Sequence, residues 1–262
     1  MKSLSMSFIV TALNEEKNII SVINNSLQSF EHFNLDGEVI VINDGSTDRT
    51  KDVIGEVINS DTRISLINHD SPKGVGASFW EGVDHAKGEI VCWLPGDNEN
   101  DPEEILRYYK LLEHVDIVVP FVFNKEARSL YRNALSFIYR FIINTTFLVN
   151  FNYTNGTVLC RKSILKDIDL RSTGFFYQTE ILIKAVKKGY LFAEVPYRLN
   201  ARKEGISKAI SYPSLKQVIK GYFQLVSDLY MRKKNVKIVG EFTEGSSTAR
   251  RNITNAQNRR CE

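Results

Sequence analysis

Three polar segments in the first hundred residues carry the side chains best suited to chemistry. They are TALNEE, NDGSTD and PGDNEND, which begin at Thr11, Asn43 and Pro95 and follow the apolar runs FIV, VIVI and IVCWL. Carboxylate oxygens are the ligands that hard divalent cations prefer. Asn14 and Asp44 could instead only cap helices. Three acidic segments converging on one edge favour a site for a metal ion and a phosphorylated ligand.

The elements that must position these segments alternate between strand and helix. Apolar runs predict strands at 7–10, 38–42, 63–67, 89–94 and 115–121, and the segments between them predict helices at 15–30, 47–58, 74–86 and 101–113. This alternation indicates an α/β fold with a mostly parallel central sheet flanked by helices. Open sheets of this kind bind ligands at the carboxyl ends of their strands.

The second half of the chain has a different pattern. It predicts a long apolar helix at 125–149, a turn and strand at 152–161, a helix at 174–188, a strand at 190–195 and an amphipathic helix at 215–230. We expect one domain over 1–235, with a nucleotide half to about 121 and an acceptor half after it. Residues 236–262 have few large apolar side chains and are expected to be disordered.

Composition excludes several classes of protein. The 262 residues include 34 basic and 31 acidic side chains, a net charge of +3, which does not indicate nucleic-acid binding. Cys92, Cys160 and Cys261 are too scattered for a disulfide framework or a zinc site, which fits a reducing cytosolic setting. The first residues predict a strand rather than a signal peptide, and no apolar run is long enough to predict a transmembrane helix.

The motifs ALNEEKNI, VINDGSTDRT, KGVGASFWEGVDHAKGEIVCWL and PGDNENDPEEI resemble, in order and spacing, the nucleotide-sugar half of family 2 glycosyltransferases. The stretch from Gly174 to Lys208 is similar to the dolichyl-phosphate mannose synthase branch of that family. The resemblance covers roughly residues 5–230. It implies a GT-A fold with C-terminal amphipathic helices and a hexosyltransferase that uses a GDP- or UDP-linked sugar.

The resemblance also implies where the nucleotide binds. Ala12 and Glu15 would contact the base and ribose, and Asp44 would hold the base. Lys73 would lie near this pocket, although a solvated lysine is an equal alternative. Thr11 stands where the family usually has a proline.

The metal-binding motif departs from the family. Its first aspartate is replaced by Pro95, its second is Asp97, and Glu99 stands where the branch often has glutamine. In an extended segment, residues at i and i+2 face the same way, so Asp97 and Glu99 would hold Mg²⁺ or Mn²⁺. The alternative is that Asp97 only caps a turn and metal is dispensable.

An acceptor with a phosphate group would need cations to hold it. The resemblance places four catalytic residues at Asp97, Glu180, Arg202 and Lys208, and an acceptor-phosphate site at Arg128, Arg132, Arg202, Ser207 and Lys208. Arginine forks suit phosphate oxygens, but Arg128 and Arg132 could also be solvated charges on a helix face. Glu180 could act as a base, position the acceptor or be a surface charge.

The helices at 125–149 and 215–230 have more apolar surface than one buried face needs, and Lys216 and Lys220 flank the second. This pattern suits contact with an anionic membrane, directly or through a membrane partner, or packing on the core. The sequence therefore predicts an inverting, metal-dependent transfer of a hexose to a polyprenyl or dolichyl phosphate at the cytosolic membrane face. The alternatives are transfer to a sugar hydroxyl in polysaccharide assembly and a catalytically weak binding subunit.

Overall fold

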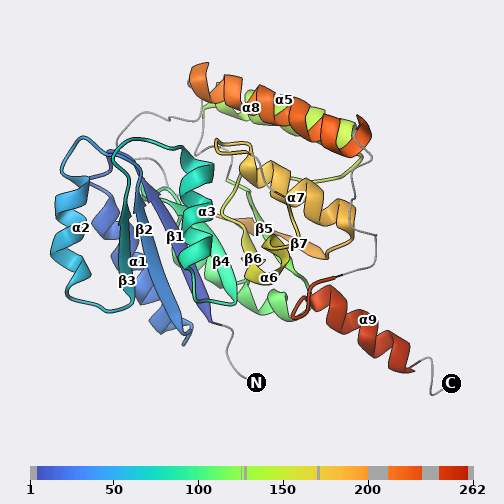
Figure 1. Cartoon of the computed structure of the whole chain (residues 1–262), viewed down its shortest axis with the longest axis horizontal. Helices are drawn as coiled ribbons and strands as arrows, with labels where there is room; N and C mark the ends of the chain where they lie inside the picture. The colour runs from blue at the N-terminus through green and yellow to red at the C-terminus, as the bar shows by residue number, and fades with distance from the viewer. Residues whose placement is uncertain are drawn as a thin grey trace.

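A computed structural model describes residues 5–124, 126, 129–169, 172–199, 212–231 and 242–258. Its centre is a seven-stranded sheet in the order β3-β2-β1-β4-β6-β5-β7 (Figure 1). The strands are β1 (Met6–Ala12), β2 (Gly37–Asn43), β3 (Ile64–Asn68), β4 (Ile90–Pro95), β5 (Ile117–Val122), β6 (Leu159–Arg161) and β7 (Phe192–Tyr197). The expected mostly parallel α/β sheet is confirmed.

Strand direction brings the three polar segments to one edge of the sheet. Strands β1, β2, β3 and β4 are parallel to one another, and among the seven strands that the structure describes only β6 runs against its neighbours. The register pairs Ala12 with Asn43 and Thr11 with Pro95. Because β1, β2 and β4 end at the same level, the loops that follow these three strands are adjacent at the carboxyl edge of the sheet.

Helices cover both faces of the sheet, and each face has its own apolar core. The helices are α1 (Ile19–His32), α2 (Thr50–Ile58), α3 (Val75–His85), α4 (Pro102–Leu106), α5 (Leu130–Phe147), α6 (Lys162–Leu165), α7 (Tyr177–Lys188), α8 (Tyr212–Val226) and α9 (Ser247–Asn258), with a 3₁₀ turn η1 (Tyr109–Glu113) and a π-helical turn η4 (Ser227–Met231). Successive strand residues point to opposite faces. Ile9 therefore packs with α3, α5 and α7, whereas Phe8 and Val10 pack with α1, α2 and α4.

Several helices have bounds that differ from those predicted by the apolar pattern. The helix predicted at 15–30 begins at Ile19, after a polar turn. The helix predicted at 125–149 begins at Leu130, because the Ser129 hydroxyl accepts a hydrogen bond from the backbone N–H of Arg132. The segment 101–113 divides into α4 and η1.

Helices α5 and α8 lie side by side across one end of the molecule (Figure 1). The Thr146 and Tyr222 hydroxyl groups are 2.9 Å apart, and the Phe147 and Tyr230 rings stack with centroids 6.3 Å apart. Much of the remaining surface of these helices is apolar and exposed. Among the described residues, no helix combines the length and apolar character needed to cross a membrane.

The prediction of a disordered tail is wrong for residues 242–258. Asp116, which is fully buried, accepts hydrogen bonds from the backbone N–H groups of Ser247 (2.5 Å) and Thr248 (3.3 Å) at the start of α9. The Phe242 ring packs on Tyr190 with centroids 5.2 Å apart. Composition did not predict an ordered segment here, because this short polar segment is held by a single buried carboxylate, that of Asp116. Beyond this anchor, α9 extends away from the body (Figure 1).

Candidate functional site at the carboxyl edge of the sheet

Each of the three polar loops turns sharply directly after its strand. Asn14 follows β1 with φ 54°, Gly45 follows β2 with φ 72°, and Asn98 follows β4 with φ 58°. Such left-handed backbone favours glycine and asparagine over most other residues. The amide and glycine positions in the motifs are therefore explained by the turns, which leave the neighbouring carboxylates at the sheet edge.

The loops after β1 and β2 are joined by hydrogen bonds. The Asn14 side chain accepts from the N–H of Thr47 (2.8 Å), and the N–H of Asn14 donates to the Ser46 hydroxyl (2.9 Å). The N–H of Glu15 donates to the Thr50 hydroxyl at 2.8 Å. Many polar side chains of these motifs therefore hold together the loops that form the rim of the site. Their hydrogen-bonding groups are used for these contacts between loops.

Asp44 is the most enclosed carboxylate of the rim, with 5% of its surface exposed. Its Oδ1 accepts from the N–H of Lys73 (2.8 Å), and its Oδ2 accepts from the N–H of Gly74 (3.0 Å). His69 Nδ1 lies 2.7 Å from Oδ1. The backbone N–H of Asp44 donates to the carbonyl of Ala12. The structure therefore brings together Ala12, Asp44 and the loop that contains Lys73, as the sequence analysis expects for a nucleotide pocket.

Lys73 contributes to this loop mainly through its backbone. Its ammonium group is half-exposed and lies 3.3 Å from Glu81 Oε2. Glu15, the other expected nucleotide contact, accepts a hydrogen bond from the Asn18 amide at 3.1 Å. Nucleotide binding by Glu15 and Lys73 stays a prediction.

The glycines before and within α3 allow the backbone of Thr173 to approach the start of this helix closely. The N–H groups of Gly76 and Ala77 donate to the carbonyl of Thr173, at 2.7 Å and 3.1 Å. A Cβ on Gly76 would lie 2.7 Å from that oxygen, and one on Gly74 would lie 2.8 Å from it. Because Thr173 occupies the start of α3, this helix end is not an open phosphate cradle.

The segment that carries Asp97 and Glu99 is a turn. The expectation that it is extended is wrong, because Asn98 is left-handed and Asp97 Oδ1 accepts the N–H of Glu99 at 3.2 Å. The two carboxylates nevertheless remain neighbours in one loop, and Glu99 is buried. Among the described residues, no group of three or more His, Cys, Asp or Glu side chains could hold a metal ion.

Two carboxylates fit a cation that completes its shell with other ligands. Mg²⁺ usually keeps several waters and binds through one or two carboxylates together with substrate phosphates. The oxygen donors of Asp97 and Glu99 satisfy that requirement, whereas they would be a poor set for a closed structural zinc site.

Thr11 replaces the usual proline and makes a specific contact. Its hydroxyl accepts a hydrogen bond from Trp93 Nε1 at 2.8 Å, and its carbonyl accepts from the N–H of Gly96 at 3.0 Å. Thr11 therefore ties β1 to the end of β4, directly before the Asp97 turn. The sequence identified Thr11 only as a replacement for proline and did not predict its contact with Trp93.

Glu180 is buried in the first turn of α7, so the interpretation of it as a surface charge is wrong. Its Oε1 lies 2.6 Å from the ammonium of Lys184, and its Oε2 accepts the N–H of Ser172 at 3.1 Å. The carboxylate therefore holds the segment next to Thr173, which in turn contacts the start of α3. Its role toward an acceptor remains a prediction.

The expected acceptor-phosphate residues are mostly outside the described part of the chain. Arg128, Arg202, Ser207 and Lys208 lie in that remainder. Arg132 is described; it occupies the first turn of α5 and is partly exposed.

His69 is the main site residue that sequence reasoning missed. It lies directly after β3, which ends at Asn68. The same rule that identified the other loops, namely that ligands bind beyond the carboxyl ends of parallel strands, applies to this fourth strand. A polar residue at that position was therefore a usable signal.

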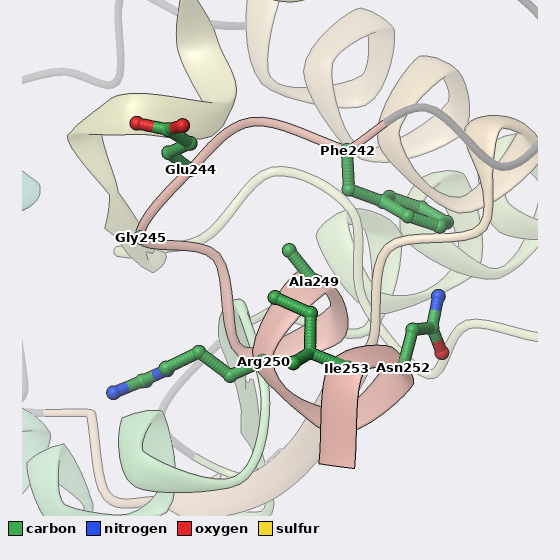
Figure 2. A pocket seen from close by; sticks show the side chains of 7 residues that line it. All are labelled: Phe242, Glu244, Gly245, Ala249, Arg250, Asn252 and Ile253. Carbon is green, nitrogen blue, oxygen red and sulfur yellow. The ribbon is translucent and has the colours of Figure 1, made fainter. Parts of the chain in front are cut away.

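A different part of the molecule has the hollow shown in Figure 2, which is lined by Phe242, Glu244, Gly245, Ala249, Arg250, Asn252 and Ile253. These residues belong to the tail anchored at Asp116, which precedes β5. Since β5 runs parallel to β7 and in the same direction as β4, this hollow lies toward the amino edge of the sheet. It is separate from the three polar loops.

Comparisons with known proteins agree with this geometry. The family model described as Glycosyl transferase family 2 matches residues 7–169. A dolichol-phosphate mannosyltransferase of Pyrococcus furiosus is 25% identical over 217 residues, which cover 78% of this chain and 59% of that protein. A dodecaprenyl-phosphate galacturonate synthase of Rhizobium johnstonii is 23% identical over 212 residues, covering 79% and 62%.

A dolichyl-phosphate beta-glucosyltransferase of Trichomonas vaginalis is 35% identical over 97 residues, covering 35% of this chain and 30% of that protein. The chain thus spans less than two thirds of the length of each of these relatives. Among solved structures, glucosyl-3-phosphoglycerate synthase of Mycobacterium tuberculosis with Mn²⁺, UDP and phosphoglyceric acid superposes with a TM-score of 0.66 at 19% identity, covering 85% of this chain and 78% of that one. At that identity, the likeness shows the fold.

Proposed function

Because this chain belongs to glycosyl transferase family 2 and has its GT-A fold, we propose that it transfers a hexose from a nucleoside diphosphate to a polyprenyl or dolichyl phosphate. Three relatives support the acceptor class, since each is named for a reaction on a dolichyl or dodecaprenyl phosphate. The donor is a GDP- or UDP-linked sugar. The reaction inverts the anomeric carbon, because the acceptor attacks from the face opposite to the leaving group.

The observation that carries the proposal is the exposed apolar surface of the α5–α8 pair. Its large apolar side chains with more than a third of their surface exposed are Leu130, Tyr131, Leu135, Phe137, Ile138, Phe141, Ile142, Leu215, Ile219 and Phe223. So many exposed apolar side chains on one pair of adjacent helices favour an interaction site. A polyprenyl acceptor lies in a membrane, so this surface is where the enzyme would meet the bilayer.

Charge on the same helices supports that orientation. Lys216 and Lys220 are exposed on α8, and Arg132 lies in the first turn of α5. Basic residues beside an apolar helix face attract it to anionic lipid, by about 1 kcal/mol for each residue near the surface. We place the enzyme peripherally at the cytosolic membrane face, bound to lipid directly or through a membrane partner.

Donor binding takes place at the three polar loops. Ala12, Glu15 and Asp44 would contact the nucleoside, with Lys73 beside them, while Asp97 and Glu99 would hold Mg²⁺ or Mn²⁺. Solved neighbours with this fold bind Mn²⁺ or Mg²⁺ together with UDP. Such an ion, when bound, would stabilise the negative charge of the departing nucleoside diphosphate.

The acceptor supplies its own nucleophile. A phosphomonoester has a second pKa of about 6, so its oxygen is ionised near neutral pH and no general base is needed. Arg128, Arg132, Arg202, Ser207 and Lys208 would instead hold the phosphate. Glu180 would serve in positioning, because its two carboxylate oxygens already accept from Lys184 and Ser172.

A panel assay tests this function. The purified chain is incubated with UDP- and GDP-linked hexoses, Mg²⁺ and a short polyprenyl phosphate in detergent, and lipid-linked sugar is measured. We expect product from one class of donor and none in the presence of EDTA. Transfer only to oligosaccharide hydroxyl groups would support the polysaccharide alternative, and failure to bind or turn over any donor would support a non-catalytic role.

A further inference from the structure

His69 is a buried imidazole placed between two carboxylates. Its side chain is 1% exposed, its Nδ1 lies 2.7 Å from Asp44 Oδ1, and its Nε2 lies 2.7 Å from Glu81 Oε2. Its backbone N–H donates to the carbonyl of Asn43 at 2.9 Å, which fixes the residue beside the end of β2. The ring is therefore held at both nitrogens and at its backbone.

The two contacts determine which protons the ring carries. A neutral imidazole has one N–H and one acceptor nitrogen, and an ionised carboxylate can only accept. Asp44 already accepts from two backbone N–H groups, which suits its ionised form. The hydrogen bond from His69 lowers the pKa of Glu81, outweighing its burial, so this carboxyl is ionised as well. Donation to both carboxylates at once needs an N–H on each ring nitrogen, which is the imidazolium form.

The charges around the ring support that form. Asp44 approaches from the loop after β2 and Glu81 approaches from α3. The ammonium of Lys73 lies 3.3 Å from Glu81 Oε2, the same oxygen that faces His69. One cationic ring between two anions leaves this buried cluster with far less uncompensated charge than a neutral ring would.

We propose that His69, as an imidazolium held by Glu81, is the positioning residue that fixes the Asp44 carboxylate for the nucleobase of the donor. This inference rests on the proposed function, because it takes the donor to be a nucleotide sugar. His69 and the N–H of Lys73 both bind Oδ1, whereas Oδ2 accepts the N–H of Gly74. Each carboxylate oxygen has two lone pairs, so Oδ2 can accept a further N–H, such as the ring N–H of uracil or guanine.

Two variants test this role. Glutamine at position 69 cannot donate to both carboxylates at once, so His69→Gln loses at least one charge-assisted hydrogen bond. Glu81→Gln removes the second anion and lets the ring become neutral. We expect each to weaken binding of UDP or GDP by roughly tenfold or more. The apparent KM for the donor rises accordingly, while kcat at saturating donor changes less.

The matched control is His114→Gln. His114 is exposed and lies just before β5, at the opposite edge of the sheet. This variant has the same chemical change and should bind nucleotide like the wild type. Thermal unfolding of each variant identifies any loss of affinity that comes from loss of the fold.

Protonation is read directly by ¹⁵N NMR of the histidine side chains, at a pH above the usual histidine pKa of about 6.5. His69→Gln assigns the signal. We expect His69 to have two protonated nitrogens in the wild type and one in Glu81→Gln. A single protonated nitrogen in the wild type, or wild-type nucleotide affinity in a folded His69→Gln, would overturn the proposal. A doubly protonated ring in a protein that binds no nucleoside diphosphate would instead contradict the proposed function.

Discussion

The carboxylate of Glu180 lies 2.6 Å from the ammonium of Lys184, one turn along α7, and 4% of the Glu180 side chain is exposed. A base that takes a proton from an acceptor hydroxyl must be available to that hydroxyl. Glu180 is instead held by Lys184 and by the N–H of Ser172. This pairing favours an acceptor that arrives ionised.

We therefore predict that Glu180→Gln is milder than the loss of either cation. Glutamine can still accept the N–H of Ser172, and transfer to polyprenyl phosphate should fall by less than about tenfold. Arg202→Ala and Lys208→Ala should each lower the rate by roughly ten- to a hundredfold, from about 1.5–3 kcal/mol per lost charge-assisted hydrogen bond. Rates and nucleotide affinities are measured for all three.

The exposed Lys87→Ala variant is the control for removal of a positive charge. A dead Glu180→Gln enzyme beside near-normal Arg202 and Lys208 variants would show that the hydroxyl acceptor is correct.

Asp97→Asn and Glu99→Gln should lower turnover by roughly a hundredfold each. The reason is that a bound cation would stabilise the negative charge on the departing diphosphate in the transition state by several kcal/mol. Both residues lie in a loop after β4, so the folded structure should be retained. Turnover against Mg²⁺ concentration, together with circular dichroism, separates the two effects. Full activity in Glu99→Gln would show that the Glu99 carboxylate is not needed to bind the metal ion.

Gly76→Ala should destabilise the protein, since the added Cβ would lie 2.7 Å from the Thr173 carbonyl. Overpacking of this kind costs about 1–3 kcal/mol. Gly55→Ala is the matched control, because it lies in α2 with nothing within 4 Å of the new Cβ, and it should add about 0.4–1 kcal/mol. Thermal unfolding should therefore move in opposite directions, and a Gly76→Ala protein as stable as the wild type would contradict the close approach of Thr173.

The α5–α8 surface should bind anionic vesicles. Phe141→Ser and Phe223→Ser remove side chains that are 62% and 64% exposed. Each should lower partition by roughly ten- to a hundredfold, from about 1.5–3 kcal/mol per aromatic side chain. Ile253→Ser, at a residue 59% exposed on α9, is the control. Vesicle sedimentation measures all three, and equal losses from α9 and α5 would show that the surface is not specific.

Much of the fold followed from the strand-and-helix alternation, because buried parallel strands have continuous apolar runs. The carboxyl-edge rule then located Asp44 and Asp97. Sequence spacing could not show that Asn98 turns the chain, since one left-handed residue changes where its neighbours point without altering the motif.

Long-range contacts account for the other differences. Glu180 looks like an ordinary helix charge until Lys184 and Ser172 are placed around it. Residues 242–248 form a short and mostly polar segment. Its hydrogen bonds to the buried carboxylate of Asp116, which is far away in the sequence, explain why it is ordered. Composition contains no information about such pairings.

The most direct test of the account compares two acceptors that differ in one group. Polyprenyl phosphate and the corresponding polyprenol are offered separately with the same nucleotide sugar and Mg²⁺, and the glycosylated lipids are quantified by mass spectrometry. We predict transfer to the phosphate alone, giving a sugar joined through a phosphodiester. Equal transfer to polyprenol, or product formed only with a sugar hydroxyl, would contradict the assignment of a phosphate acceptor.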